Sequence, residues 1–440
     1  MKEIVRKNAR SFRLICNEKD IEALEDLLRS EGFEFETEPF HPLARVLTKE
    51  PFGLGASLAA AFGRIYIQDR SSMLPPVMLA PESGDLVLDM CASPGSKTGF
   101  LSQLVGNDGF VVGNEPAKDR LAVLRQNLRR LNLPQVHTTG YNGEDLDFPD
   151  GYWDLIQLDP PCSGWGTEDK NPNASQLWSG EKTEPLEKLQ RELLEKASRL
   201  LRDGGRVLYS TCTTNVRENE EQVRWALDTL PFKQAPLPEP AGFTLAPSEL
   251  DGVEGIVRVP PGDMGQGFFL ACFEKVGGEE YISDSRNKNK RSFPGKRLKK
   301  EKLVCAAPIC WDNLPDGELY EFSGQVYFLN GIALDVFPDH MRWQGLGLGK
   351  VSGKNFRPDP ESRVLVPDFE IAEKTFPDNF LNVTEAEELK VLLSGQGLST
   401  PTSKGKGAVA LYFKGLPLGW LGRKGKRLLW SGKKIAAFCH

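Results

Sequence analysis

Apolar and polar positions follow two different periods along this chain, and the change of period divides it into regions. In the first region an apolar run at residues 12–16 precedes isoleucine and leucine at helical spacing over 21–28, and residues 33–36 then alternate with period two. This pattern predicts, in order, a strand, a helix and two further strands before residue 50. The region is therefore expected to form a small α+β unit.

A second region begins near residue 75, where apolar runs typical of buried strands alternate with amphipathic stretches. This alternation predicts a doubly wound parallel sheet with helices between successive strands. Gly204-Gly205 is predicted to end a helix, and 255–259 and 267–273 are predicted to pair as a closing antiparallel hairpin. The predicted strands are 86–88, 110–112, 152–158 and 206–209, and the predicted helices are 97–105, 117–131, 185–201 and 218–230.

Beyond residue 275 the chain first becomes polar and basic and then regains short alternating segments. Nine Lys and Arg residues lie between Arg286 and Lys302 against one acid, which predicts a linker or an exposed arm. A solvated tether and a nucleic-acid contact are both compatible with this composition. Alternation at 318–322 and 408–413 predicts a separate β-rich domain. The predicted units are 1–75, 76–276, 277–302 and 303–440.

Composition narrows the class of protein. The chain has 440 residues, of which 40% are hydrophobic and 26% charged, as expected of a soluble protein with several domains. It contains no run of about 18 apolar residues and no apolar signal segment at its start, so a cytoplasmic protein without a membrane partner is expected. The net charge of −6 does not by itself favour nucleic acid, although basic residues cluster a second time between Lys404 and Lys434.

The eight cysteines are spread over the whole length, which indicates reduced thiols rather than a disulfide scaffold. Cys305 and Cys310 form a C-x4-C pair, but no second cysteine or histidine pair lies at zinc spacing. No metal site is expected.

The segment 89–98, Asp-Met-Cys-Ala-Ser-Pro-Gly-Ser-Lys-Thr, follows the first predicted strand of the sheet and opens the first helix. Backbone amides converge on bound ligands at this point of doubly wound folds. The segment matches neither the Walker phosphate loop nor G-x-G-x-x-G. Glu115 follows the next strand, where such folds offer an acid to ribose hydroxyls. A ligand with a ribose and an amino-acid carboxylate is predicted, and S-adenosylmethionine fits.

Two cysteines follow two later predicted strands, Cys162 within Leu-Asp-Pro-Pro-Cys-Ser-Gly and Cys212 within Tyr-Ser-Thr-Cys-Thr. Open α/β sheets place their sites at such strand ends. Methyl transfer to C5 of cytosine requires prior attack at C6 by a strong nucleophile, and a thiolate is the best that side chains supply. Asp159 and a second thiol suit the proton transfers that follow. The pair therefore predicts methyl transfer to a pyrimidine carbon.

Other interpretations of the cysteines are weaker. A free cysteine usually acts as a small buried hydrophobe, which suffices for Cys16, Cys91, Cys272 and Cys439. A cysteine–histidine hydrolase is disfavoured, because neither histidine that precedes Cys212 lies at a comparable strand end.

Three ordered motifs, the segment 89–98 and the two cysteine motifs, followed by Glu218-Asn-Glu220, resemble those of the RNA cytosine-C5 methyltransferases of the Fmu/Sun type. The resemblance covers about residues 10–275. It implies that Cys212 is the nucleophile, that Cys162 assists release of the methylated RNA, and that Asp159 lies near the cytosine and the cofactor amino group. The implied cofactor contacts are Cys91, Ala92, Ser93, Pro94, Gly95, Ser96, Lys97, Glu115, Asn142 and Asp159.

The resemblance also implies an N-terminal RNA-binding unit, a Rossmann-like core and a PUA-like C-terminal region. Within the family the chain is most similar to the bacterial enzymes that act on small-subunit ribosomal RNA, through residues 65–73 and the C-terminal extension. A monomeric S-adenosylmethionine-dependent RNA cytosine-C5 methyltransferase with a covalent Cys212–C6 adduct is therefore predicted. Transfer RNA is the alternative substrate, and a ribosome-assembly RNA-binding factor with secondary methyl transfer is the alternative function.

Asn142 departs from the family pattern, and four aromatic residues allow two interpretations. The family usually has Asp-Gly where this chain has Asn142-Gly143, so recognition of the adenine amino group by the Asn carbonyl is an expectation only. The aromatic residues near the C-terminus suit either base stacking or an ordinary core. They are Tyr412, Phe413, Trp420 and Trp430.

Overall fold

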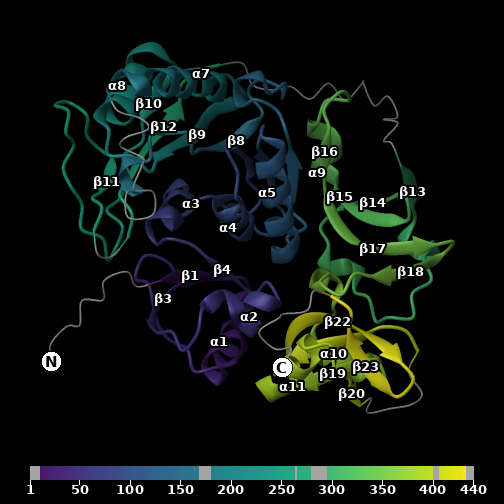
Figure 1. Ribbon diagram of the computed structural model, residues 1–440. Coiled ribbons are helices and arrows are strands. Elements are labelled where there is room, and N and C mark those ends of the chain that lie inside the picture. Colours follow the sequence, from purple (N-terminus) through teal and green to yellow (C-terminus); the bar gives the residue numbers. More distant parts are fainter. Residues whose placement is uncertain (1–9, 168–179, 263–264, 279–294, 400–405, 433–440) are drawn as a thin grey trace.

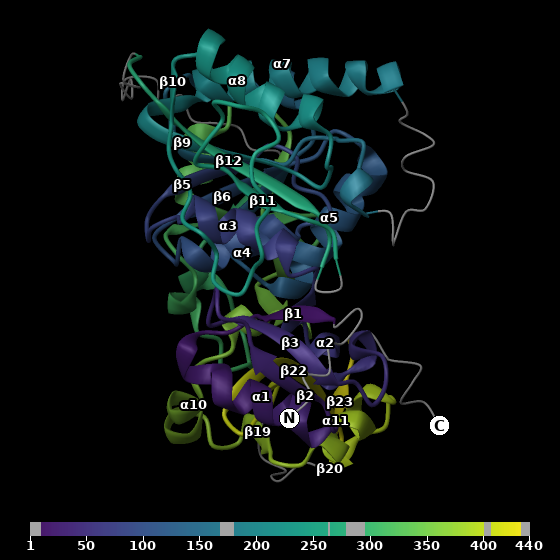
Figure 2. The ribbon, with the colours of Figure 1, turned by 90° about the vertical axis from the view of Figure 1, so that its left-hand side faces the viewer.

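The fold is built around one mostly parallel sheet that carries helices on both faces (Figures 1 and 2). The computed structural model describes residues 10–167, 180–262, 265–278, 295–399 and 406–432. Within these residues the strand order is β10–β12–β9–β8–β5–β6–β7–β16, and β11 pairs with β12. The strands are β5 (Leu86–Asp89), β6 (Phe110–Asn114), β7 (Val136–Thr139), β8 (Trp153–Leu158), β9 (Leu201–Thr211), β10 (Phe232–Gln234), β11 (Val257–Val259), β12 (Phe268–Lys275) and β16 (Trp343–Gln344).

Alternate residues of each central strand pack under different helices, as the period of two requires. Leu88, Ile156 and Tyr209 belong to the core beneath α7, whereas Val87 and Leu155 pack with α3, α4 and α5. Figure 2 shows α7 and α8 on one face of the sheet and α3 and α4 on the other. Burial on both faces explains why these strands are continuous apolar runs in the sequence. The helices are α3 (Leu74–Leu79), α4 (Ser96–Leu104), α5 (Lys118–Leu131), α7 (Glu184–Leu200) and α8 (Glu220–Thr229).

The N-terminal unit is an antiparallel sheet of order β2–β3–β1–β4. Leu24, Leu27 and Leu28 form the buried face of α1 and pack with Phe12 and Leu14 of β1. The predicted order of strand, helix, strand, strand is confirmed, and β4 adds an edge strand that the pattern did not predict. The elements are β1 (Ser11–Leu14), α1 (Ile21–Ser30), β2 (Glu34–Thr37), β3 (Ala44–Lys49), α2 (Leu58–Ala61) and β4 (Ile65–Ile67).

The described part of the C-terminal region forms one sheet of order β13–β14–β15–β17–β18 and another of order β19–β21–β22–β23–β20. Its predicted β-rich character is confirmed. The region is not packed separately, because β16 pairs with β7 and extends the central sheet. The elements are β13 (Lys296–Leu298), β14 (Gly317–Phe322), β15 (Gln325–Asn330), α9 (Gly331–Val336), β17 (Leu346–Ser352), β18 (Asn355–Pro358), α10 (Phe369–Thr375), β19 (Phe380–Val383), α11 (Ala386–Leu393), β20 (Leu398–Ser399), β21 (Val409–Phe413), β22 (Leu416–Lys424) and β23 (Arg427–Trp430).

A buried arginine joins the three regions. The Arg363 guanidinium donates to the carbonyl oxygens of Phe62 at 3.2 Å, Gly63 at 3.1 Å and Arg130 at 2.7 Å, and also to that of Leu131. Burial lowers the pKa of Arg363 well below its ordinary value, and the carbonyls compensate for the lost water. The last two carbonyls end α5, where a cation is favourable. The C-terminal region thereby fixes α5 against the N-terminal unit.

The sequence prediction at Gly204-Gly205 is wrong. The helix α7 ends at Leu200, and both glycines lie inside β9. Gly204 has a φ of 70°, and the pairing of β9 with β8 shifts register beside it, between Trp153 and Leu155. The glycines therefore form an irregularity within the strand. The prediction failed because a glycine pair is also typical of a helix end.

Two further predictions concern the hairpin that closes the central sheet and the basic linker that follows it. The antiparallel pairing of 255–259 with 267–273 is confirmed as β11 with β12. The end of the predicted linker is β13, which pairs with β14. Residues 279–294 of that linker and Cys439 lie outside the described residues.

The C-terminal aromatic residues considered for base stacking belong to the core. Tyr412 and Phe413 are fully buried, Trp420 is 2% exposed and Trp430 is 5% exposed. The Trp420 Nε1–H donates to the Ser362 carbonyl at 2.9 Å. Buried rings cannot stack on a base, so this interpretation is wrong for all four.

Candidate active site

The predicted site residues converge at the carboxyl edge of the central sheet. β5 lies between β6 and β8, so the order of strands reverses there. Open parallel sheets bind ligands at this switch point. Glu115, Asp159 and Cys212 each directly follow one of the parallel strands β6, β8 and β9.

Two half-buried thiols are in contact at this edge. The Sγ atoms of Cys162 and Cys212 are 3.3 Å apart. The pKa of Cys212 is lowered, chiefly by its hydrogen bond with the Cys162 thiol, while burial and Asp159 oppose the shift and Lys97 adds to it. The pKa of Cys162 is raised well above its ordinary value by the same hydrogen bond and by burial. Cys212 is therefore the thiol that ionises first.

Asp159 is held beside the thiols by two donors. Lys97 Nζ lies 2.6 Å from one carboxylate oxygen, and the Ser210 hydroxyl donates to the other at 3.2 Å. Burial lowers the pKa of Lys97, but Asp159 outweighs it and the net shift is upward. The ammonium group also lies 5.3 Å from the ring centroid of Phe268. This arrangement places a fixed cation and a fixed carboxylate at the thiol pair.

The charge of Lys97 gives a prediction for the reactivity of Cys212. Lys97→Met removes a cation that lowers the pKa of Cys212 and leaves Asp159 uncompensated, so this pKa is expected to rise. The thiolate fraction at neutral pH then falls and is recovered only at higher pH. The measurement is the rate of alkylation of Cys212 by iodoacetamide as a function of pH, read by peptide mass spectrometry.

Lys118→Met, at the exposed start of α5, removes the same charge away from the thiols and serves as the control. Its alkylation profile is expected to match that of the unaltered protein. An unchanged or lower midpoint in Lys97→Met contradicts the assigned role of Lys97.

The carboxyl ends of β5 and β6 offer carboxylates suited to S-adenosylmethionine. Glu115 is 2% exposed, accepts a hydrogen bond from the Ala117 N–H at 3.0 Å and lies 3.4 Å from Arg120. Asp89 accepts a hydrogen bond from the Thr98 hydroxyl at 2.7 Å and is also hydrogen-bonded to the backbone of Cys91. Burial raises the pKa of Asp89 to about 7. These carboxylates can accept hydrogen bonds from ribose hydroxyls and from an ammonium group, so the acceptors present fit this cofactor.

Residues 90–95, the cofactor loop, lead from the end of β5 into the start of α4. Gly95 has a φ of 104°, which favours glycine, and it precedes the first residue of α4. The Ala92 N–H donates to the Asn114 carbonyl at 2.8 Å, and the Arg13 guanidinium donates to the Ser96 carbonyl at 3.1 Å. The N-terminal unit thus contacts the start of α4 directly.

Asn142 lies at the same edge, after β7. Its side-chain amide donates to Asp145 at 3.0 Å, which leaves its carbonyl oxygen as the side-chain atom free to accept from a ligand within the described structure. Tyr141 beside it donates its N–H to the Asn114 side chain at 3.0 Å. This geometry is compatible with the expected contact to an adenine amino group.

Sequence reasoning missed several residues of the site. Asp89 lies in the motif 89–98 and Ser210 in the motif around Cys212, but neither was assigned a role, and Phe268 gave no signal because it lies in an apolar strand. Arg13 did carry one, since a charged residue interrupts the apolar run of β1. It is fully buried 4.4 Å from the Phe100 ring centroid, and burial lowers its pKa to about 9.

Known proteins match this architecture. Residues 76–274 match the family 16S rRNA methyltransferase RsmB/F. Ribosomal RNA small subunit methyltransferase F of Cronobacter sakazakii is 31% identical over 388 residues, which cover 85% of this chain and 78% of that protein. The chain belongs to the RsmB/F family.

Other matches agree with membership of the RsmB/F family. The Klebsiella pneumoniae protein named ribosomal RNA small subunit methyltransferase F is 31% identical over 395 residues, covering 85% of this chain and 78% of that protein. The crystal structure of a methyltransferase homolog protein from Pyrococcus horikoshii is 33% identical, with a TM-score of 0.52, and covers 61% of this chain and 87% of that one.

Membership confirms the predicted resemblance, the doubly wound methyltransferase fold and an S-adenosylmethionine-dependent methyltransferase. Within the described ranges no helix has the length and apolar character that crossing a membrane requires. Membership does not by itself assign a role to any single residue.

Proposed function

We propose that this RsmB/F enzyme transfers the methyl group of S-adenosylmethionine to C5 of a cytosine in small-subunit ribosomal RNA. Residues 76–276 carry the chemistry, and residues 1–75 and 303–440 bind RNA. The observation that carries the proposal is the contact of 3.3 Å between the Cys162 and Cys212 thiols, with the Lys97–Asp159 ion pair beside them. The names of the relatives support the choice of ribosomal RNA.

In the proposed reaction the Cys212 thiolate adds to C6 of cytosine, which makes C5 electron-rich. Bound S-adenosylmethionine supplies the methyl group as an electrophile. As the adduct forms, N3 of the base takes up a proton from water and donates it in a hydrogen bond to Asp159, and the hydrogen bonds that Asp159 accepts from Lys97 and Ser210 hold the carboxylate there. The C5 and N3 protons then pass to water, the electrons of the C5–H bond restore the C5–C6 double bond, and the C6–S bond breaks. Cys212 leaves as a thiolate, and Cys162, which keeps its proton, assists that departure by donating a hydrogen bond to it.

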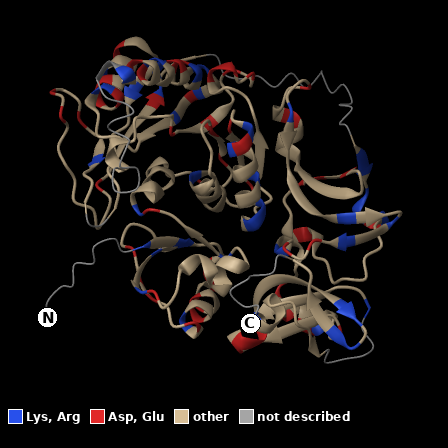
Figure 3. Ribbon diagram, in the orientation of Figure 1, with Lys and Arg blue, Asp and Glu red and all other residues tan. Residues whose placement is uncertain are grey.

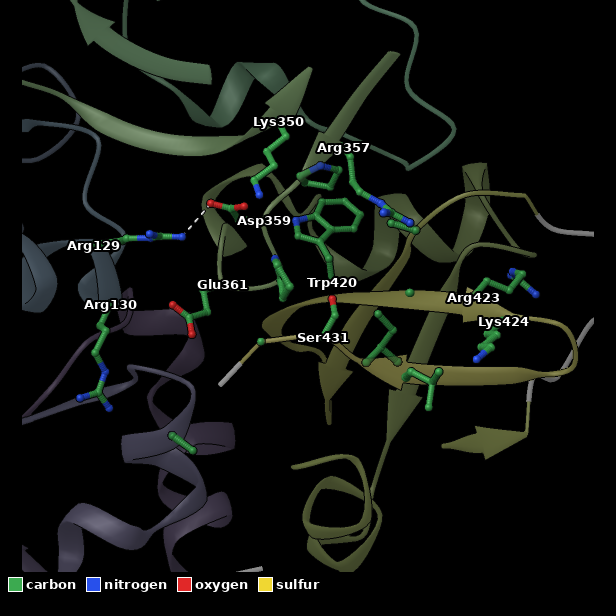
Figure 4. Close-up of a pocket in the computed structure, with 18 of the residues that line it drawn as sticks. Arg129, Arg130, Lys350, Arg357, Asp359, Glu361, Trp420, Arg423, Lys424 and Ser431 are labelled. Carbon is green, nitrogen blue, oxygen red and sulfur yellow. Dashed lines mark hydrogen bonds and ion pairs between the residues drawn. The ribbon is translucent and has the colours of Figure 1, made fainter. Parts of the chain in front are cut away.

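A basic groove supports RNA as the partner. It has a volume of about 1150 Å³ and lies between the end of α5 and the strands of the C-terminal region (Figure 4). Arg129 is paired with Asp359 at 2.8 Å, and Glu361 is the other carboxylate that lines it. Lys and Arg also colour the ends of β17 and β18 and the turn between β22 and β23 in Figure 3. The basic residues of the groove are Arg129, Arg130, Lys350, Arg357, Arg423 and Lys424.

A smaller groove extends from this one toward the cofactor loop. It shares Gly55 and Arg130 with the larger groove and is also lined by Tyr66 and Asn127. The Asn127 side chain donates to the Pro94 carbonyl of the cofactor loop at 2.8 Å. A single strand in the two grooves would therefore pass from the basic surface to the edge of the catalytic site, with its phosphates among cations.

Charge reversal in the basic groove tests this path. Lys350→Glu is expected to weaken RNA binding and to lower the slope of log affinity against log salt by about 0.7, the value for one phosphate contact on a single strand. The rate at saturating RNA is expected to be kept, because Lys350 is not at the thiols. Affinity is measured by filter binding at several salt concentrations.

Lys188→Glu, on the exposed surface of α7, makes the same charge change on a different part of the surface. It is expected to bind RNA like the unaltered protein. An equal loss of affinity in both variants contradicts a specific role for the groove.

Bisulfite sequencing of RNA from a strain that lacks the gene tests the proposed substrate. A protected cytosine in small-subunit ribosomal RNA is expected to become convertible and to regain protection when the gene is restored. Loss of protection in transfer RNA alone would favour the alternative substrate. Growth rescue by a variant that lacks both thiols would favour the assembly factor.

A further inference from the structure

The two loops that carry the thiols are joined over consecutive residues. The first loop follows β8 and the second follows β9. Besides the thiol contact, the residue after each cysteine takes part in a second one, because the Ser163 and Thr213 hydroxyls are 2.7 Å apart. Both are buried, and 50 residues separate them in the chain. Such a contact between distant loops requires a group that ties one loop to the other.

Glu218 provides this tie. Its carboxylate is fully buried, and Oε1 accepts from the Ser163 N–H and from Gln190 Nε2, both at 3.0 Å. Oε2 accepts from the Ser163 hydroxyl and from Asn215 Nδ2, the latter at 3.0 Å. Ser163 belongs to the first loop. Asn215 belongs to the second, where its N–H donates to the Thr213 hydroxyl at 3.2 Å.

The chemistry of this site requires a carboxylate. An ionised carboxyl group accepts about four hydrogen bonds and donates none, and Glu218 receives four from uncharged donors. A glutamine would turn an NH2 group toward two of these donors, and each would lose its acceptor. Burying a charge is costly unless its hydrogen bonds are complete, so the arrangement points to a role beyond filling space.

Asn219, the residue after Glu218, forms two further hydrogen bonds with the second loop. The Asn219 side chain accepts from the Thr211 hydroxyl at 2.6 Å and donates to the Thr213 carbonyl at 3.0 Å. These are the two chain neighbours of Cys212. The segment before α8 thus braces the second loop and links it to the first.

We propose that Glu218 is a positioning residue that holds the Cys162 and Cys212 thiols in contact by bonding both loops. The proposal rests on the proposed function for what the thiols do, but their spacing is measurable without RNA or cofactor. Glu218 does not touch the reacting atoms, and it acts through Ser163 and Asn215.

Oxidation of the thiols by diamide tests the spacing directly. Diamide removes two protons and two electrons from the pair and leaves a Cys162–Cys212 disulfide. In the unaltered protein the thiols are held together and the disulfide is expected to form rapidly. Glu218→Gln is expected to slow its formation by roughly tenfold or more, because the effective concentration of one thiol at the other falls. The rate is followed by mass spectrometry of peptides.

Glu221→Gln is the matched control, since it makes the same change at an exposed position of α8. It is expected to oxidise at the unaltered rate. Glu218→Asp keeps the charge but draws the carboxylate back by about 1.5 Å. Slowed oxidation is expected here too, and it would show that the length of the side chain is needed as well as its charge. Slow oxidation of the unaltered protein, or unaltered rates in both Glu218 variants, overturns the proposal.

Methyl transfer gives the second measurement. Glu218→Gln is expected to lower kcat by roughly tenfold or more while KM for RNA and for S-adenosylmethionine stays unchanged, because thiol alignment affects the chemical step and not binding. A fall in kcat with unaltered oxidation overturns the role in spacing and leaves the proposed function intact. If Cys212→Ala keeps full activity, the proposed function fails, while the oxidation result still decides the role of Glu218.

Discussion

Cys212→Ala is expected to abolish methyl transfer from labelled S-adenosylmethionine to RNA, with a loss on the order of 10⁴-fold or more. In the proposed reaction no bond to C6 forms without the thiolate, and C5 then keeps too little electron density to take the methyl group. Cys212 is the thiol with the lowered pKa, next to Cys162 and the Lys97–Asp159 pair. RNA affinity is expected to persist, because the basic groove is untouched.

Cys305→Ala provides the control, since it removes a half-buried thiol of the C-terminal region. It is expected to keep full activity. Substantial methyl transfer by Cys212→Ala, measured at several pH values, is incompatible with the role assigned to this residue.

Cys162→Ala is expected to accumulate a covalent complex of protein and RNA that survives denaturing electrophoresis. In the proposed reaction Cys212 still attacks C6 in this variant, but its departure lacks the assistance of the second thiol. The substitution also removes the hydrogen bond that lowers the pKa of Cys212, so the pKa rises and the complex is expected to form faster at higher pH. The measurement is the yield of the slowly migrating band against pH.

The double variant Cys162→Ala with Cys212→Ala is expected to form no complex. If Cys212→Ala alone traps RNA, the roles of the two thiols are reversed. If neither variant traps RNA, no stable adduct is part of the reaction.

The sequence predicted the central sheet well because burial on both faces leaves strong apolar runs, as in β5 and β8. It missed β7, a short strand of sequence Val-His-Thr-Thr without apolar alternation. It could not predict β16, because a strand of residues 343–344 carries no pattern and joins the sheet only through β7. The error at Gly204-Gly205 has a similar origin, since a glycine pair has the same composition in a helix end and in an irregular strand.

The site was predictable in outline and not in detail. Cys162 and Cys212 each follow a predicted strand of one parallel sheet. Because parallel strands end at the same edge, the sequence predicts that the two thiols lie there together. The pairing of Lys97 with Asp159 and the buried bonds of Glu218 depend on side chains that are far apart in the sequence. No local pattern records such contacts. The C-terminal aromatic residues misled in the opposite way. Their residue types suit stacking on RNA bases, but their burial in the core prevents that contact.

In the proposed reaction the sulfur of Cys212 bonds to the cytosine. The most direct test is mass spectrometry of the complex trapped by Cys162→Ala, after digestion of both the RNA and the protein. A nucleotide mass on the peptide that contains Cys212 is the predicted result. A nucleotide on any other peptide contradicts the claim.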